Sequence, residues 1–362
     1  MLIPSALLPR DGRFGSGPSK VPANHLSFDA TWMGTSHRKA PVKDVVGRIR
    51  EGLHDLFRLP HGYEVALGNG GASLLWDAIP FCLVEDRPRA ATFGQFSTKA
   101  ANALRTNPMV SDPVIDSAEP GTALLPRTSE GVDSYLYPHN ETSTGAMLPV
   151  KRIGGPEALT IVDATSAAGG VDFDAAEVDV YYFSPQKCFA SDGGLWFAAL
   201  SPAAIERIER LTAERWVPDI LNMKLALDSS RKNQTLNTPA LATLHLMLAQ
   251  LEWMLEEGGL RAMDARTQAS SAIVYDWAQR TDWAHPFVEK QHRSQVVATI
   301  DIDLPADEVS AVCRASGIVD IDGYRGLGRN QLRVATFPAV EPADITALLE
   351  SLTWVGQQLP QS

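Results

Sequence analysis

Short apolar runs alternate with helical stretches along the N-terminal and central parts of the chain. The runs cover residues 65–67, 90–93, 135–137, 159–162 and 180–183, and glycine, proline or polar residues separate them from stretches with helical spacing. Because strands that alternate with helices form a mainly parallel sheet covered by helices, this pattern predicts an α/β fold.

The pattern changes after Pro239. Long helical stretches at 241–257 and 260–280 flank the pair Gly258-Gly259, and two apolar runs and two helical stretches follow them. A chain of 362 residues is also long for one core. We therefore expect a large domain over residues 14–257 and a smaller α+β domain over 258–362, with residues 1–13 packed against the smaller one.

Charge and composition exclude several classes of protein. The chain has 32 basic and 43 acidic residues, a net charge of -11, which disfavours general binding to nucleic acid or anionic membranes. The apolar runs are too short to span a bilayer, and the first residues lack the pattern of a secretory signal, so we expect a cytoplasmic protein. Three dispersed cysteines predict buried thiols, with neither a disulfide framework nor a metal site.

Lys187 is the first candidate for chemistry. It lies in YYFSPQKCFASDGGLWFAAL, between two apolar runs. A lysine in a turn there could simply point into solvent. Alternatively, an amine held in an apolar pocket or near a cation loses proton affinity, which suits Schiff-base formation with an aldehyde cofactor.

Two earlier segments complete a possible cofactor site. Asp163 follows an apolar run and could pair with a protonated pyridine nitrogen, or it could only cap the next turn. The segment 68–73, GNGGAS, precedes a helical stretch and could hold a phosphate at the helix N-terminus, or it could be an ordinary turn. Each signal is weak alone, but their order along the chain favours one shared site.

Several longer motifs resemble those of one enzyme family. They are RFGSGPSKVP, GTSHRKAP, GNGGAS, PHNETSTG, VDATSAAGG, SPQKCFASDGG, NTPA and GYRGLGRNQLRVA. Together they resemble the phosphoserine aminotransferases, class V enzymes of fold type I that use pyridoxal 5'-phosphate. The resemblance implies a mainly parallel seven-stranded sheet flanked by helices, plus a smaller α+β domain.

The resemblance also implies roles for residues around the cofactor. Lys187 would form the internal aldimine and move the proton, and Asp163 would pair with the pyridine nitrogen. Phe96 would stack on the ring, where many relatives have Trp, and Thr142 would lie beside the ring hydroxyl. The phosphate would be held by Ala72, Ser73 and Gln186, with Asn237 and Thr238 from a neighbouring subunit. A homodimer with shared active sites follows from this arrangement.

Substrate binding would depend on four cationic or polar side chains. By resemblance, His37 and Arg38 contact the substrate phosphate, Arg325 is another phosphate ligand, and Arg333 binds the α-carboxylate. A guanidinium group matches both anions in geometry. Tyr324 stands where some relatives have His, and a phenol cannot become cationic near neutral pH.

The implied reaction is reversible transamination of 3-phosphohydroxypyruvate with glutamate, giving O-phosphoserine and 2-oxoglutarate in serine biosynthesis. A different class V enzyme, such as a serine or alanine:glyoxylate aminotransferase, is the nearest alternative. A cysteine desulfurase would need a mobile cysteine, whereas Cys313 lies in a helical stretch. A non-catalytic protein that binds a phosphate ligand is a further alternative, although the chain has neither a Walker pattern nor a GxGxxG motif.

Overall fold

The computed structural model describes residues 1–27 and 30–359. A seven-stranded sheet with the order β1-β9-β8-β7-β4-β2-β3 forms the centre of the molecule. Only β9 runs antiparallel to its neighbours, and the other pairings in the sheet are parallel. The strands are β1 (Glu64–Asn69), β2 (Pro88–Thr92), β3 (Val114–Ser117), β4 (Ser134–Pro138), β7 (Leu159–Asp163), β8 (Val180–Phe183) and β9 (Leu195–Leu200). The predicted mainly parallel sheet is confirmed.

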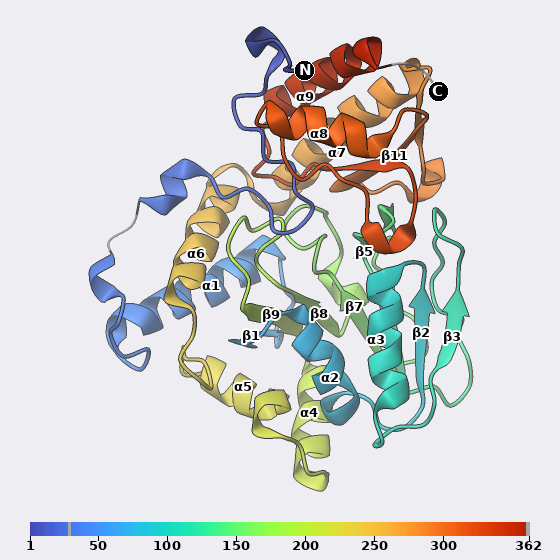
Figure 1. The fold of residues 1–362 in the computed structure, drawn as a ribbon. Helices are drawn as coiled ribbons and strands as arrows, with labels where there is room; N and C mark the ends of the chain where they lie inside the picture. Colours follow the sequence, from blue (N-terminus) through green and yellow to red (C-terminus); the bar gives the residue numbers. More distant parts are fainter. Residues whose placement is uncertain (28–29, 360–362) are drawn as a thin grey trace.

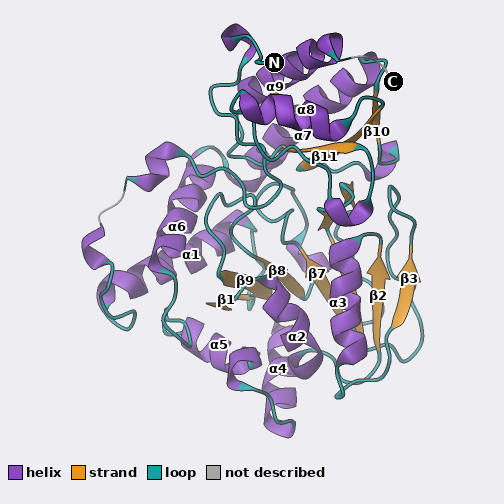
Figure 2. Ribbon diagram, viewed as in Figure 1, coloured by secondary structure: helices purple, strands orange, loops and turns teal. Residues whose placement is uncertain are grey.

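Helices cover both faces of this sheet (Figure 2). Along β1, Val65 and Leu67 pack in one apolar cluster with α1 and α6, whereas Ala66 packs in another with α2, α3 and α4. Successive strand residues point to opposite faces, so a strand buried on both sides is apolar throughout, without polar alternation. The helices are α1 (Ala40–Leu56), α2 (Ala72–Cys82), α3 (Gln95–Thr106), α4 (Pro202–Glu214), α5 (Met223–Ser230) and α6 (Leu241–Glu256).

A second, three-stranded antiparallel sheet has the order β10-β11-β12. It packs with α7, α8 and α9, which Figure 1 shows grouped near the N-terminus, away from the large sheet. The elements are α7 (Gly259–Arg280), β10 (Ala284–Pro286), β11 (Val297–Ile302), α8 (Ala306–Ala315), β12 (Gln331–Ala335) and α9 (Pro342–Gln358). The division of the chain at residue 258 stays a prediction.

Residues near the N-terminus lie against this second group. Ile3 shares an apolar cluster with α7 and α9, and the Arg10 backbone N–H donates to the Asp344 carboxylate at 2.9 Å. The short elements are β5 (Asn140–Glu141), β6 (Ala146–Met147), and the 3-10 helices η1 (Ser5–Leu7), η2 (Ala23–Leu26), η3 (Ala30–Trp32), η4 (Ala175–Glu177), η5 (Asp219–Leu221), η6 (Lys290–His292) and η7 (Arg325–Leu327).

Candidate active site

A cavity of about 320 Å³ lies beyond the carboxyl ends of β4, β7 and β8, next to the N-terminus of α2. Ligands of open α/β sheets bind at this edge, because the loops that follow parallel strands meet there. The lining residues are Gly17, Pro18, Gly71, Ala72, Ser73, Trp76, Phe96, Pro138, Asn140, Thr142, Asp163, Thr165, Ser166, Gln186 and Lys187. The three segments that the sequence singled out therefore surround one cavity.

Lys187 is buried at the wall of this cavity, with 9% of its surface exposed. Its Nζ donates to the Ser16 carbonyl at 2.6 Å. Burial, reinforced by the positive charge of Arg333, lowers the pKa of Lys187 from 10.5 to about 8. The amine thus loses its proton far more readily than a surface lysine, as a nucleophile and proton carrier requires.

A glycine makes room for this amine. A Cβ atom at Gly17 would lie 2.0 Å from Lys187 Nζ, closer than any real contact. Gly17 also has a φ of 143°, a backbone conformation that favours glycine. The absence of a side chain at Gly17 therefore leaves space for the Lys187 amine. Gly17 lies in the RFGSGPSKVP motif, which was identified only by its resemblance to the family.

Asp163, at the end of β7, accepts hydrogen bonds on both carboxylate oxygens. Its Oδ1 accepts from the Thr165 backbone N–H at 2.9 Å and from the Thr165 hydroxyl at 2.6 Å. Its Oδ2 accepts from Trp76 Nε1 and from the Tyr182 hydroxyl, both at 3.1 Å. These donors hold the carboxylate at the wall of the cavity that it lines, so capping the turn leaves Asp163 in place for the predicted cofactor role.

The N-terminus of α2 lies at another side of the cavity. Gly71 caps the helix without any side-chain hydrogen bond, and Ala72 and Ser73 line the cavity. The Oε1 atom of Gln186 is buried there without a partner. Unpaired N–H groups and the helix dipole favour an anion at such a point, as expected for a phosphate.

Phe96 reaches the cavity from the first turn of α3. Its position depends on the buried carboxylate of Glu141, which accepts from the Phe96 N–H at 3.3 Å and from the Ser97 N–H at 2.8 Å. A carboxylate at a helix N-terminus stabilises that first turn. Glu141 thereby fixes the direction of α3 and the placement of the aromatic ring.

Thr142 lies in the cavity wall, where its hydroxyl donates to the Ser166 hydroxyl at 2.8 Å. Asn140 donates to the same Ser166 oxygen at 2.8 Å, and its own Oδ1 is buried without a partner. Sequence reasoning did not select Asn140, Ser166 or Trp76. The first two lie within the PHNETSTG and VDATSAAGG motifs, and Trp76 lies one helical turn after Ala72, which is the signal that could have found it.

Two of the three predicted substrate arginines lie at a second, larger cavity of about 940 Å³. Arg325 and Arg333 both line it, together with Tyr324. Arg333 also contacts a residue of the first cavity, since its Nη1 donates to the Thr142 carbonyl at 3.3 Å. Its Nε is buried without a partner, and burial lowers its pKa. A desolvated, unpaired guanidinium of this kind is a ready site for an anion.

Four predicted residues lie outside both cavities. Asn237, Thr238 and Arg38 are exposed, and His37 is partly exposed. The Thr238 carbonyl accepts from Asn69 Nδ2 at 2.8 Å, which places Thr238 near the glycine loop. The contacts with cofactor or substrate phosphate expected of these four residues therefore stay predictions.

Comparison with known proteins gives consistent results. Residues 123–325 match the class-V aminotransferase family model. The chain is 52% identical over 368 residues to a phosphoserine aminotransferase of Nocardioides sp., covering 99% of this chain and 98% of that protein. It is 50% identical over 367 residues to the phosphoserine aminotransferase of Rhodococcus jostii, with coverage of 99% and 98%.

The chain belongs to the phosphoserine aminotransferase family. The solved phosphoserine aminotransferase of Cytophaga hutchinsonii has the same fold, with a TM-score of 0.87, 24% identity, and coverage of 95% of this chain and 99% of that one. The family assignment makes the protein a pyridoxal 5'-phosphate-dependent aminotransferase. The uncapped N-terminus of α2 and the buried Lys187 amine fit this cofactor.

Proposed function

We propose that this family member exchanges an amino group between glutamate and a phosphorylated α-keto acid, giving O-phosphoserine and 2-oxoglutarate in serine biosynthesis. One observation carries the substrate choice: the half-buried side chain of Arg333 lies beside Thr142, with a buried, unpartnered Nε, at a cavity also lined by Arg325. Two cations at one opening suit a substrate with a carboxylate and a second anion. The relatives named phosphoserine aminotransferase support the same choice.

Lys187 would hold the cofactor aldehyde, Asp163 its pyridine nitrogen, and the first turn of α2 its phosphate. When bound, pyridoxal phosphate supplies a carbonyl carbon that accepts the amino group and a ring that accepts electrons. Because its pKa is lowered to about 8, Lys187 has a larger unprotonated fraction near neutral pH than a surface lysine, which suits an amine that takes the α-proton of the bound amino acid and returns it later. Arg333 would orient the α-carboxylate during this transfer.

We also propose a homodimer in which each subunit completes the other's active site. Asn237, Thr238, His37 and Arg38 lie outside the cavities of their own chain and are wholly or partly exposed, so a partner's site is accessible to them. A cytoplasmic location belongs to the same proposal. Among the described residues, no helix has both the length and the apolar character that a membrane span requires.

The test is a titration of the purified holoprotein with amino acids, followed by its visible absorption. O-Phosphoserine and glutamate should convert the absorption to that of the aminated cofactor, whereas serine and alanine should do so poorly. Equal responses to serine, alanine and O-phosphoserine would contradict the phosphate preference and favour a different class V aminotransferase.

A substitution then tests the role of Arg38. Arg38→Ala should weaken the response to O-phosphoserine about tenfold or more, because an ionic hydrogen bond contributes roughly 1.5–3 kcal/mol, and should leave glutamate less affected. The exposed Arg10 is the matched control, and Arg10→Ala should change neither response. Equal losses for both substrates in Arg38→Ala would indicate a structural role.

A further inference from the structure

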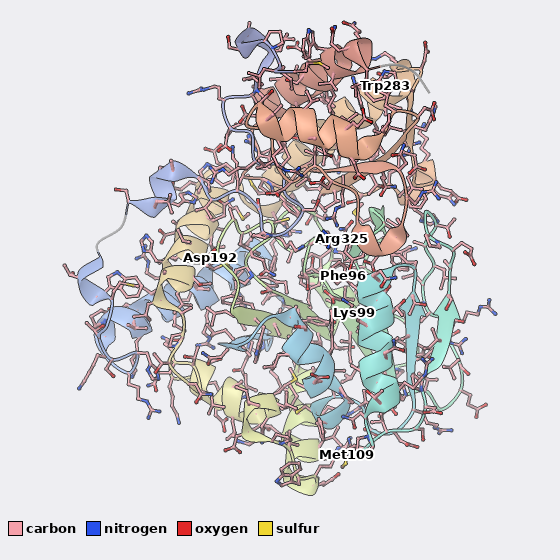
Figure 3. All side chains as sticks on the ribbon, viewed as in Figure 1. Phe96, Lys99, Met109, Asp192, Trp283 and Arg325 are labelled. Carbon is pink, nitrogen blue, oxygen red and sulfur yellow. The ribbon has the colours of Figure 1, made fainter. Side chains whose placement is uncertain are left out.

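Tyr324 lines the second cavity, next to Arg325. It precedes η7 (Arg325–Leu327), which lies at the N-terminal end of α3, where a Cβ at Gly326 would stand 3.8 Å from Gln95 Cδ. Figure 3 shows Arg325 and Phe96 close together at that end of α3, with Lys99 further along the helix. Tyr324 precedes Arg325 in the chain and lines the second cavity, whereas Phe96 lines the first.

The Tyr324 ring contacts a residue of each cavity. On one side it meets Phe96 edge-on, with the ring centroids 5.7 Å apart at an interplanar angle of 60°. On the other side the Arg333 guanidinium carbon lies 5.4 Å from the centroid of the Tyr324 ring. Edge-on aromatic pairs and cations over aromatic faces are both attractive. The phenol ring therefore joins the cofactor side of the site to the substrate side.

Arg333 has few other contacts that could direct its side chain. Its backbone is fixed in β12, where it pairs with Thr299 of β11, and its N–H donates to the Ile321 carbonyl at 2.9 Å. The guanidinium has one hydrogen bond at 3.3 Å, to the Thr142 carbonyl, and an unpartnered Nε. Within the described residues it forms no ion pair. The aromatic contact is thus a main constraint on the guanidinium.

A neighbouring glycine limits where the ring can lie. A Cβ at Gly326 would stand 2.9 Å from Cε1 of Tyr324, so any larger residue would push the ring aside. Gly326 is exposed and has no positive φ, so alanine is compatible with its backbone. The ring position can therefore be perturbed without changing Tyr324 itself.

We propose that Tyr324 is a positioning residue, whose aromatic ring holds the Arg333 guanidinium in place for the substrate α-carboxylate and supports Phe96. The inference rests on the proposed function. Its action is through Arg333 and requires only the ring, since the phenol hydroxyl has no hydrogen bond to a described residue. It predicts an effect shared by every substrate with an α-carboxylate, whether phosphorylated or not.

The experiment measures half-saturation of the holoprotein with glutamate and with O-phosphoserine, by the absorption change of the first half-reaction. Tyr324→Leu should raise both half-saturation concentrations by a similar factor, between about twofold and thirtyfold for a cation–π contact, with a smaller change in the limiting rate. Tyr324→Phe keeps the ring and should restore both values to within about twofold of the wild type.

A second pair of variants tests the ring position independently. Gly326→Ala should raise both half-saturation concentrations, but by less than Tyr324→Leu, and adding it to Tyr324→Leu should cause no further increase. Gly155→Ala is the matched control, because a Cβ there meets no atom within 4 Å and its φ is not positive. It should leave both values unchanged.

Two results would overturn the inference. Wild-type affinity for both substrates in Tyr324→Leu would show that the ring does not position Arg333. A loss confined to O-phosphoserine, not restored by Tyr324→Phe, would assign Tyr324 a direct contact with the phosphate through its hydroxyl. Failure of the proposed function would give a different result, because the wild-type protein would then respond equally to O-phosphoserine and serine. In that case the half-saturation of wild type and Tyr324→Leu with glutamate would still test whether Tyr324 positions Arg333.

Discussion

Replacement of Lys187 by Met should stabilise the cofactor-free protein at neutral pH. The pKa of Lys187 falls from 10.5 to about 8 because the amine is buried and lies near Arg333. At about 1.4 kcal/mol per pH unit, the native state bears a penalty of roughly 3 kcal/mol for holding this ammonium. Met has a similar volume and no charge, but loses the hydrogen bond to the Ser16 carbonyl, worth about 1 kcal/mol. The net gain at pH 7 is about 2 kcal/mol.

The pH dependence separates this effect from a change in packing. Between pH 8 and 10.5 the unfolded chain binds a proton at Lys187 and the native chain does not, so wild-type stability should rise with pH across this window. Below about pH 8 both states are protonated and the penalty is constant. Lys187→Met removes this contribution, so the variant's advantage should shrink steadily from pH 8 to 10.

The assay is denaturant unfolding of cofactor-stripped wild type and Lys187→Met at pH values from 7 to 10. Lys232→Met, at an exposed lysine, is the control and should differ little from wild type at any pH. A Lys187→Met variant that is less stable than wild type at pH 7, or a difference that does not change with pH, would refute the reasoning that Lys187 is a desolvated amine.

Three further outcomes test other parts of the site. Gly17→Ala should abolish the visible absorption of the lysine-bound cofactor, because its Cβ would lie 2.0 Å from Lys187 Nζ; normal absorption would refute this close approach. Asp163→Asn should still bind the cofactor but slow the single-turnover reaction with O-phosphoserine about tenfold to a hundredfold, since the amide cannot offer a charged acceptor; an unchanged rate would exclude the pairing. Burial raises the pKa of all three thiols, to about 12 for two of them, so a thiol reagent should label the native protein much more slowly than the unfolded protein; rapid native labelling would contradict burial of Cys82, Cys188 and Cys313.

The strands show what local pattern can and cannot reveal. Residues 159–162 and 180–183 were predictable because strands buried on both faces are apolar throughout, and the structure contains them as β7 and β8. By contrast, β3 (Val114–Ser117) was missed, since this edge strand is largely exposed and carries no apolar run. The antiparallel direction of β9 was also not evident, because an apolar run does not encode the direction of pairing.

By itself, the sequence determined the α/β class, the order of the cofactor segments, and the candidates Lys187 and Asp163, whereas Phe96 became a candidate through the family resemblance. Only the tertiary structure decided which side chains meet. The Ser16 carbonyl accepts from Lys187 across 171 positions, and Tyr324 lies between Phe96 and Arg333. Periodicity reports local burial, because it reflects the geometry of one helix or strand. Contacts between distant segments depend instead on how whole elements pack, and these contacts set the proton affinity of Lys187 and the position of Arg333.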